Sequence, residues 1–342
     1  MSVLSPPPIG LGSIAVSVSP DRTIGALWRR LLAALIDATI VGVIAFLIAL
    51  PFFETFSRLG AWGRLVGFCL AIPYYGLLNS RIGSGQTLGK RFMRLQVVNA
   101  LGETIPFSKA LLRSAFLGAP FFLNLMTLPL TRTPKFVFYL IGIIVFGLGG
   151  ITIYLVLFNR RTRQGVHDLV AGSYVADAVK KGALRVEPMW KGHWVVIGAL
   201  IVAGIIGGRI LEGKILKLAN FPVMFADVRL IEGMEGVQSA GISDLTWTSW
   251  PGPEKKTIYV VNVFWTGKKG EEEAFANRVA SQILQHDAQV MERNVLRIAI
   301  VRGYDLGIAH AEITHHFDDT PANWKTKLCG GLTKESSAPE RR

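Results

Sequence analysis

The sequence contains few charged residues and little cysteine. Only 18% of its 342 residues are charged and 50% are apolar, whereas about 25% of residues are charged in ordinary soluble proteins. This balance argues against a water-soluble enzyme. Two cysteines, Cys69 and Cys329, are too few for a disulfide framework. The N-terminus lacks the early basic residues and the unbroken apolar run of a secretory signal, so we expect residues 1–22 to form a disordered tail.

Acidic residues are scarce in the apolar part of the chain. Residues 1–208 contain 20 Lys and Arg but only 7 Asp and Glu, while the remainder contains 17 of each class, so the net charge of +13 belongs to the first part. A nucleic-acid-binding protein would carry this charge on a soluble domain. We therefore expect no nucleic-acid partner and predict a membrane protein whose basic flanks contact anionic phospholipids.

Long apolar runs predict membrane-spanning helices, each of which needs about 20 residues. Four runs meet this length: residues 31–53, 59–78, 136–158 and 193–211. A fifth candidate, residues 111–130, contains Arg113 and Pro120 and has weaker hydropathy.

The positions of the basic residues orient these spans. Segments 1–30, 79–113 and 159–191 contain 16 of the 20 Lys and Arg of the first part. Cytoplasmic segments of membrane proteins are enriched in Lys and Arg, and these three share one side only if residues 111–130 cross the membrane. We therefore predict five spans, a cytoplasmic N-terminus and an extracytoplasmic C-terminal domain. The alternative is a surface or re-entrant helix at 111–130, which gives four spans and places that domain inside.

Asp37 lies within the first predicted span, where an ionised carboxylate costs about 2.5–3.5 kcal/mol at the bilayer centre. It can serve as a proton or cation site. It can equally be a structural clamp to Arg113, Arg64 or a backbone group of a neighbouring span. Arg30 precedes it by seven residues, so both side chains share one helix face, with Arg30 nearer the cytoplasm.

Three ordered motifs carry a family resemblance. They are the Arg30 to Asp37 segment with Trp28 before it, the GQTLGKR sequence at 85–91, and RQGVHDLVAGS at 163–173. Together they resemble the RDD family of bacterial integral membrane proteins over residues 23–177. The resemblance implies that Arg30, Asp37 and Asp168 are its named residues. It also implies a multi-pass protein of the cytoplasmic (inner) membrane, with transport, including cation–proton exchange, as an expected activity.

The loop motifs also have plain interpretations. The glycine spacing at 85–89 excludes a phosphate-binding loop, and Lys90, Arg91 and Arg94 are expected to face anionic headgroups instead. Asp168 follows three arginines of the same loop. It is either an ion-entry residue or the partner of a structural salt bridge, and the salt bridge is the more common role of such a residue.

Residues 212–330 have the composition of a soluble domain. Residues 257–266 read as a buried strand, Phe275, Val279 and Ile283 give a helix a core face, and residues 295–302 and 307–317 flank a turn. We predict a small α+β domain with a helix on an antiparallel sheet, followed by a disordered tail at 331–342. Its histidines show no metal-ligand spacing and it has no nucleophile motif, so we expect no catalytic residues, metal site or cofactor.

The predicted fold class is thus an all-α membrane domain of five spans with a small α+β soluble domain. Two functions remain open. The first is transport of cations, protons or a small solute at Asp37, with Arg30 and Asp168 along its path; so few spans would favour a homo-oligomer. The second is a membrane anchor or assembly protein whose C-terminal domain binds an extracytoplasmic protein partner.

Overall fold

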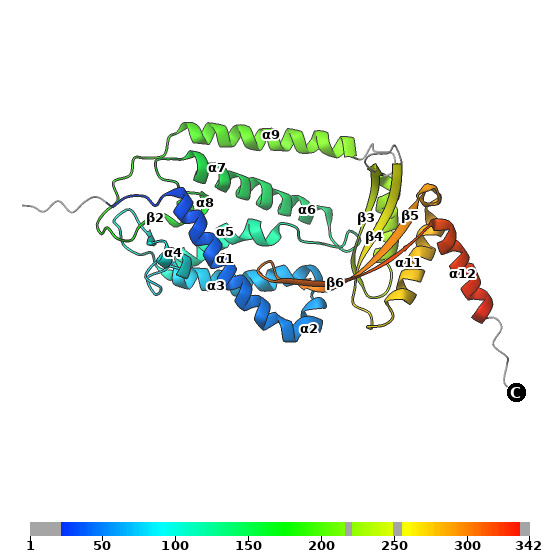
Figure 1. Ribbon diagram of the computed structural model, residues 1–342. Helices are drawn as coiled ribbons and strands as arrows, with labels where there is room; N and C mark the ends of the chain where they lie inside the picture. The colour runs from blue at the N-terminus through cyan, green and yellow to red at the C-terminus, as the bar shows by residue number, and fades with distance from the viewer. Residues whose placement is uncertain (1–21, 216–220, 249–254, 336–342) are drawn as a thin grey trace, which may run out of the picture.

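The computed structural model describes residues 22–215, 221–248 and 255–335. Figure 1 shows long helices that run lengthwise between two ends of the molecule. One end carries a two-stranded sheet, and a four-stranded sheet with its own helices lies at the other. The long helices are α1 (Leu27–Ala49), α3 (Gly63–Leu78), α5 (Phe107–Leu123), α6 (Lys135–Gly142) with α7 (Gly150–Phe158), and α9 (Gly192–Ile215).

Four helical segments are long and apolar enough to cross a membrane. They are Leu27–Ser57, Gly60–Leu78, Lys135–Phe158 and Gly192–Lys214. The first continues from α1 through a 3-10 turn (Leu50–Phe52) into α2 (Phe53–Ser57), and a second 3-10 turn (Gly60–Trp62) precedes α3. A π-helical segment (Ile143–Gly149) joins α6 to α7. Most of their large apolar side chains point outward, as they do when lipid is the solvent.

α5 contains the fifth candidate span. It packs along α3 and begins near the two-stranded sheet, and at its other end Phe122 contacts Gly307 of the four-stranded sheet domain. The helix ends at Leu123, so residues 124–130 of the predicted span are not helical. With 17 residues it is about 26 Å long, slightly less than a hydrocarbon core of about 30 Å.

The two-stranded sheet forms a small packed unit. β1 (Leu95–Val98) pairs antiparallel with β2 (Tyr174–Asp177), and the short helices α4 (Leu88–Phe92) and α8 (Val166–Ala171) lie beside it. Leu95, Val97 and Val175 pack against Ala33 of α1 and are buried. The loops between spans are therefore folded against the membrane helices.

The four-stranded sheet has the order β3-β4-β5-β6. Its strands are β3 (Val237–Thr248), β4 (Lys255–Trp265), β5 (Val295–Asp305) and β6 (His310–Asp319). α10 (Phe221–Glu232), α11 (Glu272–His286) and α12 (Pro321–Glu335) surround its core, together with a 3-10 turn (Ala288–Glu292). Phe275, Val279 and Ile283 of α11 are fully buried, as their spacing predicts.

Three sequence-based expectations for these regions were wrong. The sheet is mixed, because α11 crosses over between β4 and β5 and makes that pair parallel. Residues 331–335 of the predicted tail belong to α12. Arg22 of the predicted N-terminal tail is buried and donates hydrogen bonds to the carbonyl oxygens of Asp177 and Gly102. Residues 1–21 and 336–342 lie outside the described residues.

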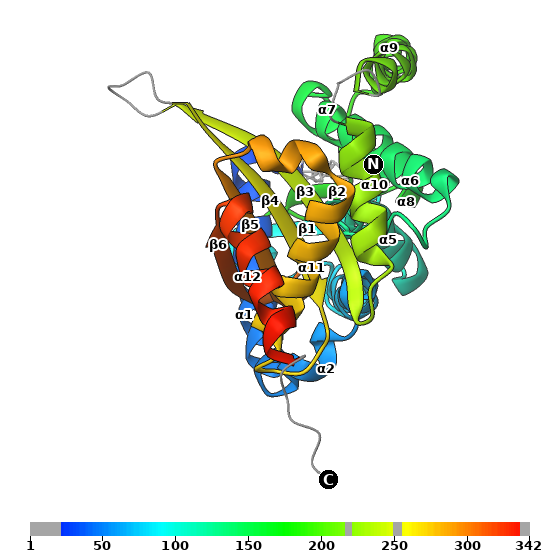
Figure 2. The same ribbon diagram turned by 90° about the vertical axis from the view of Figure 1, so that its right-hand side faces the viewer.

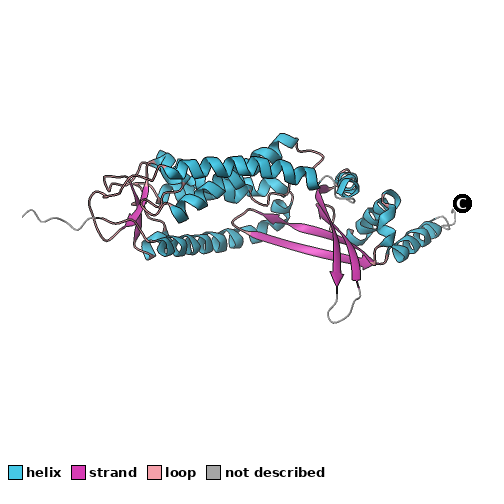
Figure 3. Cartoon of the chain, turned by 90° about the horizontal axis from the view of Figure 1, so that it is seen from above, coloured by secondary structure: helices cyan, strands magenta, loops and turns pink. Residues whose placement is uncertain are grey.

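The hairpin between β5 and β6 penetrates the helical bundle, where Figure 3 shows it alongside the helices. Leu306 and Tyr304 are buried against Ala49, Phe53 and neighbouring apolar residues. Glycines leave the room for it, since a Cβ at Gly67 would lie 1.8 Å from the carbonyl oxygen of Leu306.

Polar contacts fix the same interface. Arg64 of α3 forms an ion pair with Asp305 at 2.7 Å, and Arg302 of β5 pairs with Glu54 of α2 at 3.0 Å. The sheet domain is therefore docked through an inserted loop and flanking charges.

Candidate functional site

Asp37 lies at the contact between α1 and the loop that begins α4. Its side chain is 2% exposed. One carboxylate oxygen accepts a hydrogen bond from the hydroxyl of Thr87, and the other accepts from the backbone N–H of Gly89 at 2.8 Å. A Cβ at Gly89 would lie 2.1 Å from the carbonyl oxygen of Ala33, so only glycine lets the loop approach α1 this closely.

Asp168 forms the second carboxylate centre. It is 1% exposed and accepts a hydrogen bond at 2.8 Å from Nε of Arg113, which is 3% exposed. Ser173 donates to the same carboxylate, and His167 Nε2 lies 3.3 Å from it. Burial opposes ionisation of Asp168, but the charge of Arg113 and the contact with His167 hold its pKa well below the ordinary value. Asp168 is therefore an anion at neutral pH.

His167 is a neutral donor in this arrangement. Burial lowers its pKa below the ordinary value despite the attraction of Asp168. A neutral imidazole has one N–H, and the contact with Asp168 assigns that proton to Nε2. Nδ1 then carries a free lone pair, and it is buried without a hydrogen-bond partner.

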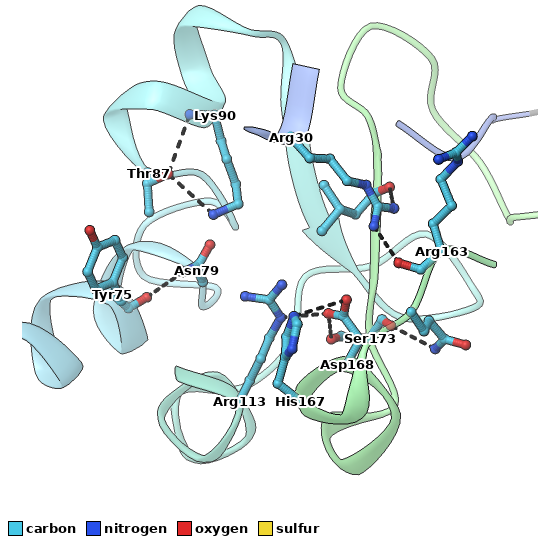
Figure 4. Close-up of polar contacts among 12 residues, drawn as sticks. Arg30, Tyr75, Asn79, Thr87, Lys90, Arg113, Arg163, His167, Asp168 and Ser173 are labelled. Carbon is cyan, nitrogen blue, oxygen red and sulfur yellow. Dashed lines mark hydrogen bonds and ion pairs between the residues drawn. The ribbon is translucent and has the colours of Figure 1, made fainter. Parts of the chain in front are cut away.

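Lys90 lies beside Thr87 (Figure 4), and the charges of Asp37 and Asp168 both act on its amine. Its Nζ contacts the hydroxyl oxygen of Thr87 at 3.4 Å and forms no ion pair within the described ranges 22–215, 221–248 and 255–335. Burial, together with the positive charge of Arg113, lowers the pKa of Lys90 to about 8. Lys90 therefore changes its charge close to physiological pH.

Arg30 approaches the cluster from α1. It donates to the carbonyl oxygens of Arg163 at 2.6 Å and Val175 at 2.7 Å, and its Nε is buried without a partner. It makes no hydrogen bond to Asp37, although the sequence places both side chains on one face of the helix. The reason is that Arg30 faces the loop before β2, whereas Asp37 faces α4.

Three cationic and two anionic side chains thus meet at the two-stranded-sheet end of the helices. By residue type and formal charge, the cations are Arg30, Lys90 and Arg113, and the anions are Asp37 and Asp168. The ionisable side chains of the cluster carry one net positive charge when Lys90 is protonated and none when it is neutral. Asn79 at the end of α3 adds a buried side-chain oxygen without a partner. Buried polar atoms of this kind commonly mark unseen water or ions.

Sequence reasoning anticipated some of these positions and missed others. Lys90 was expected at the headgroups with Arg91 and Arg94. The latter two are exposed, but Lys90 points into the cluster because it follows Gly89 on the face that packs on α1. Asn79 and the pairing of Arg113 with Asp168 were not anticipated. The signal available for Arg113 was its position as a cation within an apolar run.

The described part of the sheet domain has no cluster of oppositely charged buried side chains like that of Asp37 and Asp168. No group of three metal-ligating side chains occurs among the described residues. In β6, Asp318 forms an ion pair with Arg297 and Asp319 with Lys327. The carboxylates next to the histidines of this strand are therefore already paired with cations. Asp227 is buried, accepts a hydrogen bond from the hydroxyl of Tyr259 and contacts Nδ1 of His286. Burial raises the pKa of Asp227 above the ordinary value.

The apolar helices, the folded loops and the buried charges define an integral-membrane type of protein with an attached sheet domain. Residues 24–172 match the model of the RDD family. This part of the chain is an RDD domain, which confirms the resemblance in the three loop motifs; the region after it has no recognised family. No curated protein and no solved structure matches the chain.

Proposed function

We propose that this RDD-domain protein exchanges protons for monovalent cations across a bacterial cytoplasmic membrane. The observation that carries the proposal is Lys90, a titratable amine that forms no ion pair among the described residues and on which the charges of two buried carboxylates, Asp37 and Asp168, both act. Ionisable groups within membrane domains are costly, so their concentration at one end of the bundle favours a functional role.

The charge balance suggests how the exchange would work. With Lys90 protonated, the cluster has a net positive charge and repels a further cation. When Lys90 releases its proton, the cluster becomes neutral and a cation can bind at the carboxylate of Asp37. The proton and the cation would thus compete for one site, which is the requirement for exchange.

The topology we propose has five spans, a cytoplasmic N-terminus and an extracytoplasmic sheet domain. Two observations support it. The end that carries the two-stranded sheet also carries the basic loop segments. In addition, α5 packs along α3 and reaches from this end to the hairpin, where Phe122 lies against Gly307.

In this orientation the β5–β6 hairpin would close the outer end of the bundle. The backbone carbonyl oxygen of Ile308 lies against Gly42 of α1, five residues from Asp37, or about 7.5 Å along the helix. The outer path to the cluster is then obstructed by Leu306 and Ile308, so release to the outside would require the hairpin to move.

The test uses the full chain reconstituted in vesicles that contain a pH-sensitive dye. Sodium or potassium gradients should drive proton movement, and Asp37→Asn should abolish it. Glu187→Gln removes an exposed carboxylate at the same end and should have no effect. Absence of proton movement in every cation gradient would refute the exchange proposal.

The exposed C-terminal end of β3, which contains Leu245 and Trp247, favours a second function. Leu245 and Trp247 are exposed there on strands that project beyond the rest of the sheet (Figure 2). Exposed aromatic residues are typical anchors of protein interfaces. An anchor or assembly protein would bind its extracytoplasmic partner at this projection, and Trp247→Ser would release the partner without changing the RDD domain.

A further inference from the structure

α9 is attached to the bundle only near its ends. At one end, the hydroxyl of Tyr154 on α7 contacts His193 Nδ1 at 2.9 Å. At the other, Tyr139 of α6 donates to Glu212 at 3.2 Å. Every residue from 198 to 211 is exposed, a stretch of about 21 Å that covers all faces of the helix. The middle of α9 therefore does not pack against α6 or α7, and the open space beside it is the crevice of the following paragraphs.

The crevice opens into a cavity at the end near the two-stranded sheet. The cavity has a volume of about 560 Å³ and is lined by Tyr154, Phe158, Arg160, Arg161, Trp190 and His193. It combines aromatic rings with two guanidinium groups at the point where α7 ends and α9 begins. Tyr and Trp at helix ends are typical of the membrane–water boundary.

The arginines give the cavity its preference for an anion. Arg161 contacts the exposed carboxylate of Glu187 at 3.2 Å, and Arg160 is exposed and forms no ion pair within the part of the chain that the structure describes. Lys191 lies next to Trp190 in the sequence and adds a further cation. Arginine matches the geometry of phosphate oxygens through its planar donors.

We propose that this cavity and crevice bind one anionic phospholipid. Its phosphate would contact Arg160 and Arg161, its headgroup would lie against Trp190 and His193, and its acyl chains would run between α9 and α7. The chains would fill the space that no protein side chain occupies, and the lipid would join α9 to the RDD domain. This inference does not depend on transport.

A second copy of the chain is a weaker candidate for the crevice. The hydroxyl contacts at both ends hold α9 to α6 and α7, so a second helix could enter between them only by breaking these contacts. The arginines also lie at the end of the crevice, where a phosphate would be located and a partner helix would offer only apolar side chains.

The experiment measures lipid binding to the delipidated full chain by native mass spectrometry. We expect phosphatidylglycerol to bind in preference to phosphatidylcholine, with one lipid more strongly held than the rest. The double variant Arg160→Gln/Arg161→Gln should weaken that binding at least about tenfold, because each basic residue near a lipid surface contributes about 1 kcal/mol. The matched control, Arg91→Gln/Arg94→Gln, removes the same charge from exposed positions and should retain it.

Four results would overturn the proposal. The first is equal binding of both lipids, and the second is equal loss in the two double variants. The third is a dimer cross-linked through cysteines placed along α9 with no lipid retained, which would assign the crevice to a second copy. The fourth is displacement of the bound lipid by inorganic phosphate alone, which would show that the site recognises phosphate and not a phospholipid.

Discussion

Neutralising Asp168 tests the buried ion pair that joins α5 to α8. Asp168→Asn preserves the shape and most hydrogen bonds of the side chain but leaves the charge of Arg113 buried without an anion. Arg113 and Asp168 are 3% and 1% exposed, and removing one partner of such a pair costs about 3–5 kcal/mol. For a domain of this size the melting temperature should fall by roughly 10 °C.

The assay is thermal unfolding of the purified full chain in detergent, followed by tryptophan fluorescence. Arg113→Gln should destabilise the protein to a similar extent, because it leaves Asp168 buried alone. The double variant Arg113→Gln/Asp168→Asn should lose clearly less unfolding free energy than the sum of the losses in the two single variants, since both charges are then gone. Single losses below about 1 kcal/mol, or strictly additive losses, would refute the assignment of this pair as a buried, coupled contact.

The same pair predicts the direction of the pH response. The folded-state pKa of Asp168 lies below its ordinary value, so the anion stabilises the fold above the ordinary carboxyl range. This contribution is lost as the pH falls through the folded pKa. The difference in stability between the Asp168→Asn variant and the unmodified protein should therefore become smaller in acid.

Further predictions concern glycine and lysine positions. Gly67→Val should expel the β5–β6 hairpin, since its Cβ would lie 1.8 Å from the carbonyl oxygen of Leu306. In that background, maleimide labelling of a cysteine introduced by Leu306→Cys should rise. The control Gly142→Val, whose Cβ meets nothing within 4 Å, should leave this cysteine protected. Gly89→Ala should detach α4 from α1 and cost more than about 2 kcal/mol, measured by thermal unfolding; an unchanged melting temperature would contradict the close approach. Lys90→Met should remove the rise in stability expected between pH 8 and 10.5, because the folded pKa of about 8 lies below the ordinary value of 10.5.

The apolar runs and the motif order carried much information about the fold. Four runs of about 20 apolar residues predicted the four helices that are long enough to cross a membrane, because few other structures use such runs. α5 was harder to delimit, because Pro120 and the polar residues after Leu123 allow more than one end. The parallel β4–β5 pair was not anticipated, since local alternation in a strand contains no information about its neighbour.

The candidate site could be predicted as a set of residues but not as a set of contacts. Asp37 was recognisable because lipid excludes a carboxylate, and a clamp to Arg113, Arg64 or a backbone group of a neighbouring span was one of its two expected roles. Arg113 pairs with Asp168 and Arg64 with Asp305 instead. The clamp comes from Gly89, 52 positions away, and depends on the missing side chain of that glycine. Lys90 resembled any exposed basic residue in a loop. Only the packing of α4 on α1 turns it toward Asp37 and Asp168.

The pH dependence of exchange tests the central claim most directly. Proton movement in vesicles should change with a midpoint near pH 8, where Lys90 titrates. Lys90→Gln should abolish proton movement at every pH, while Arg91→Gln, which removes an exposed charge one position away, should preserve both the movement and its pH dependence. A Lys90→Gln variant with unmodified rate and pH profile would contradict the assignment of Lys90 as the proton-carrying group.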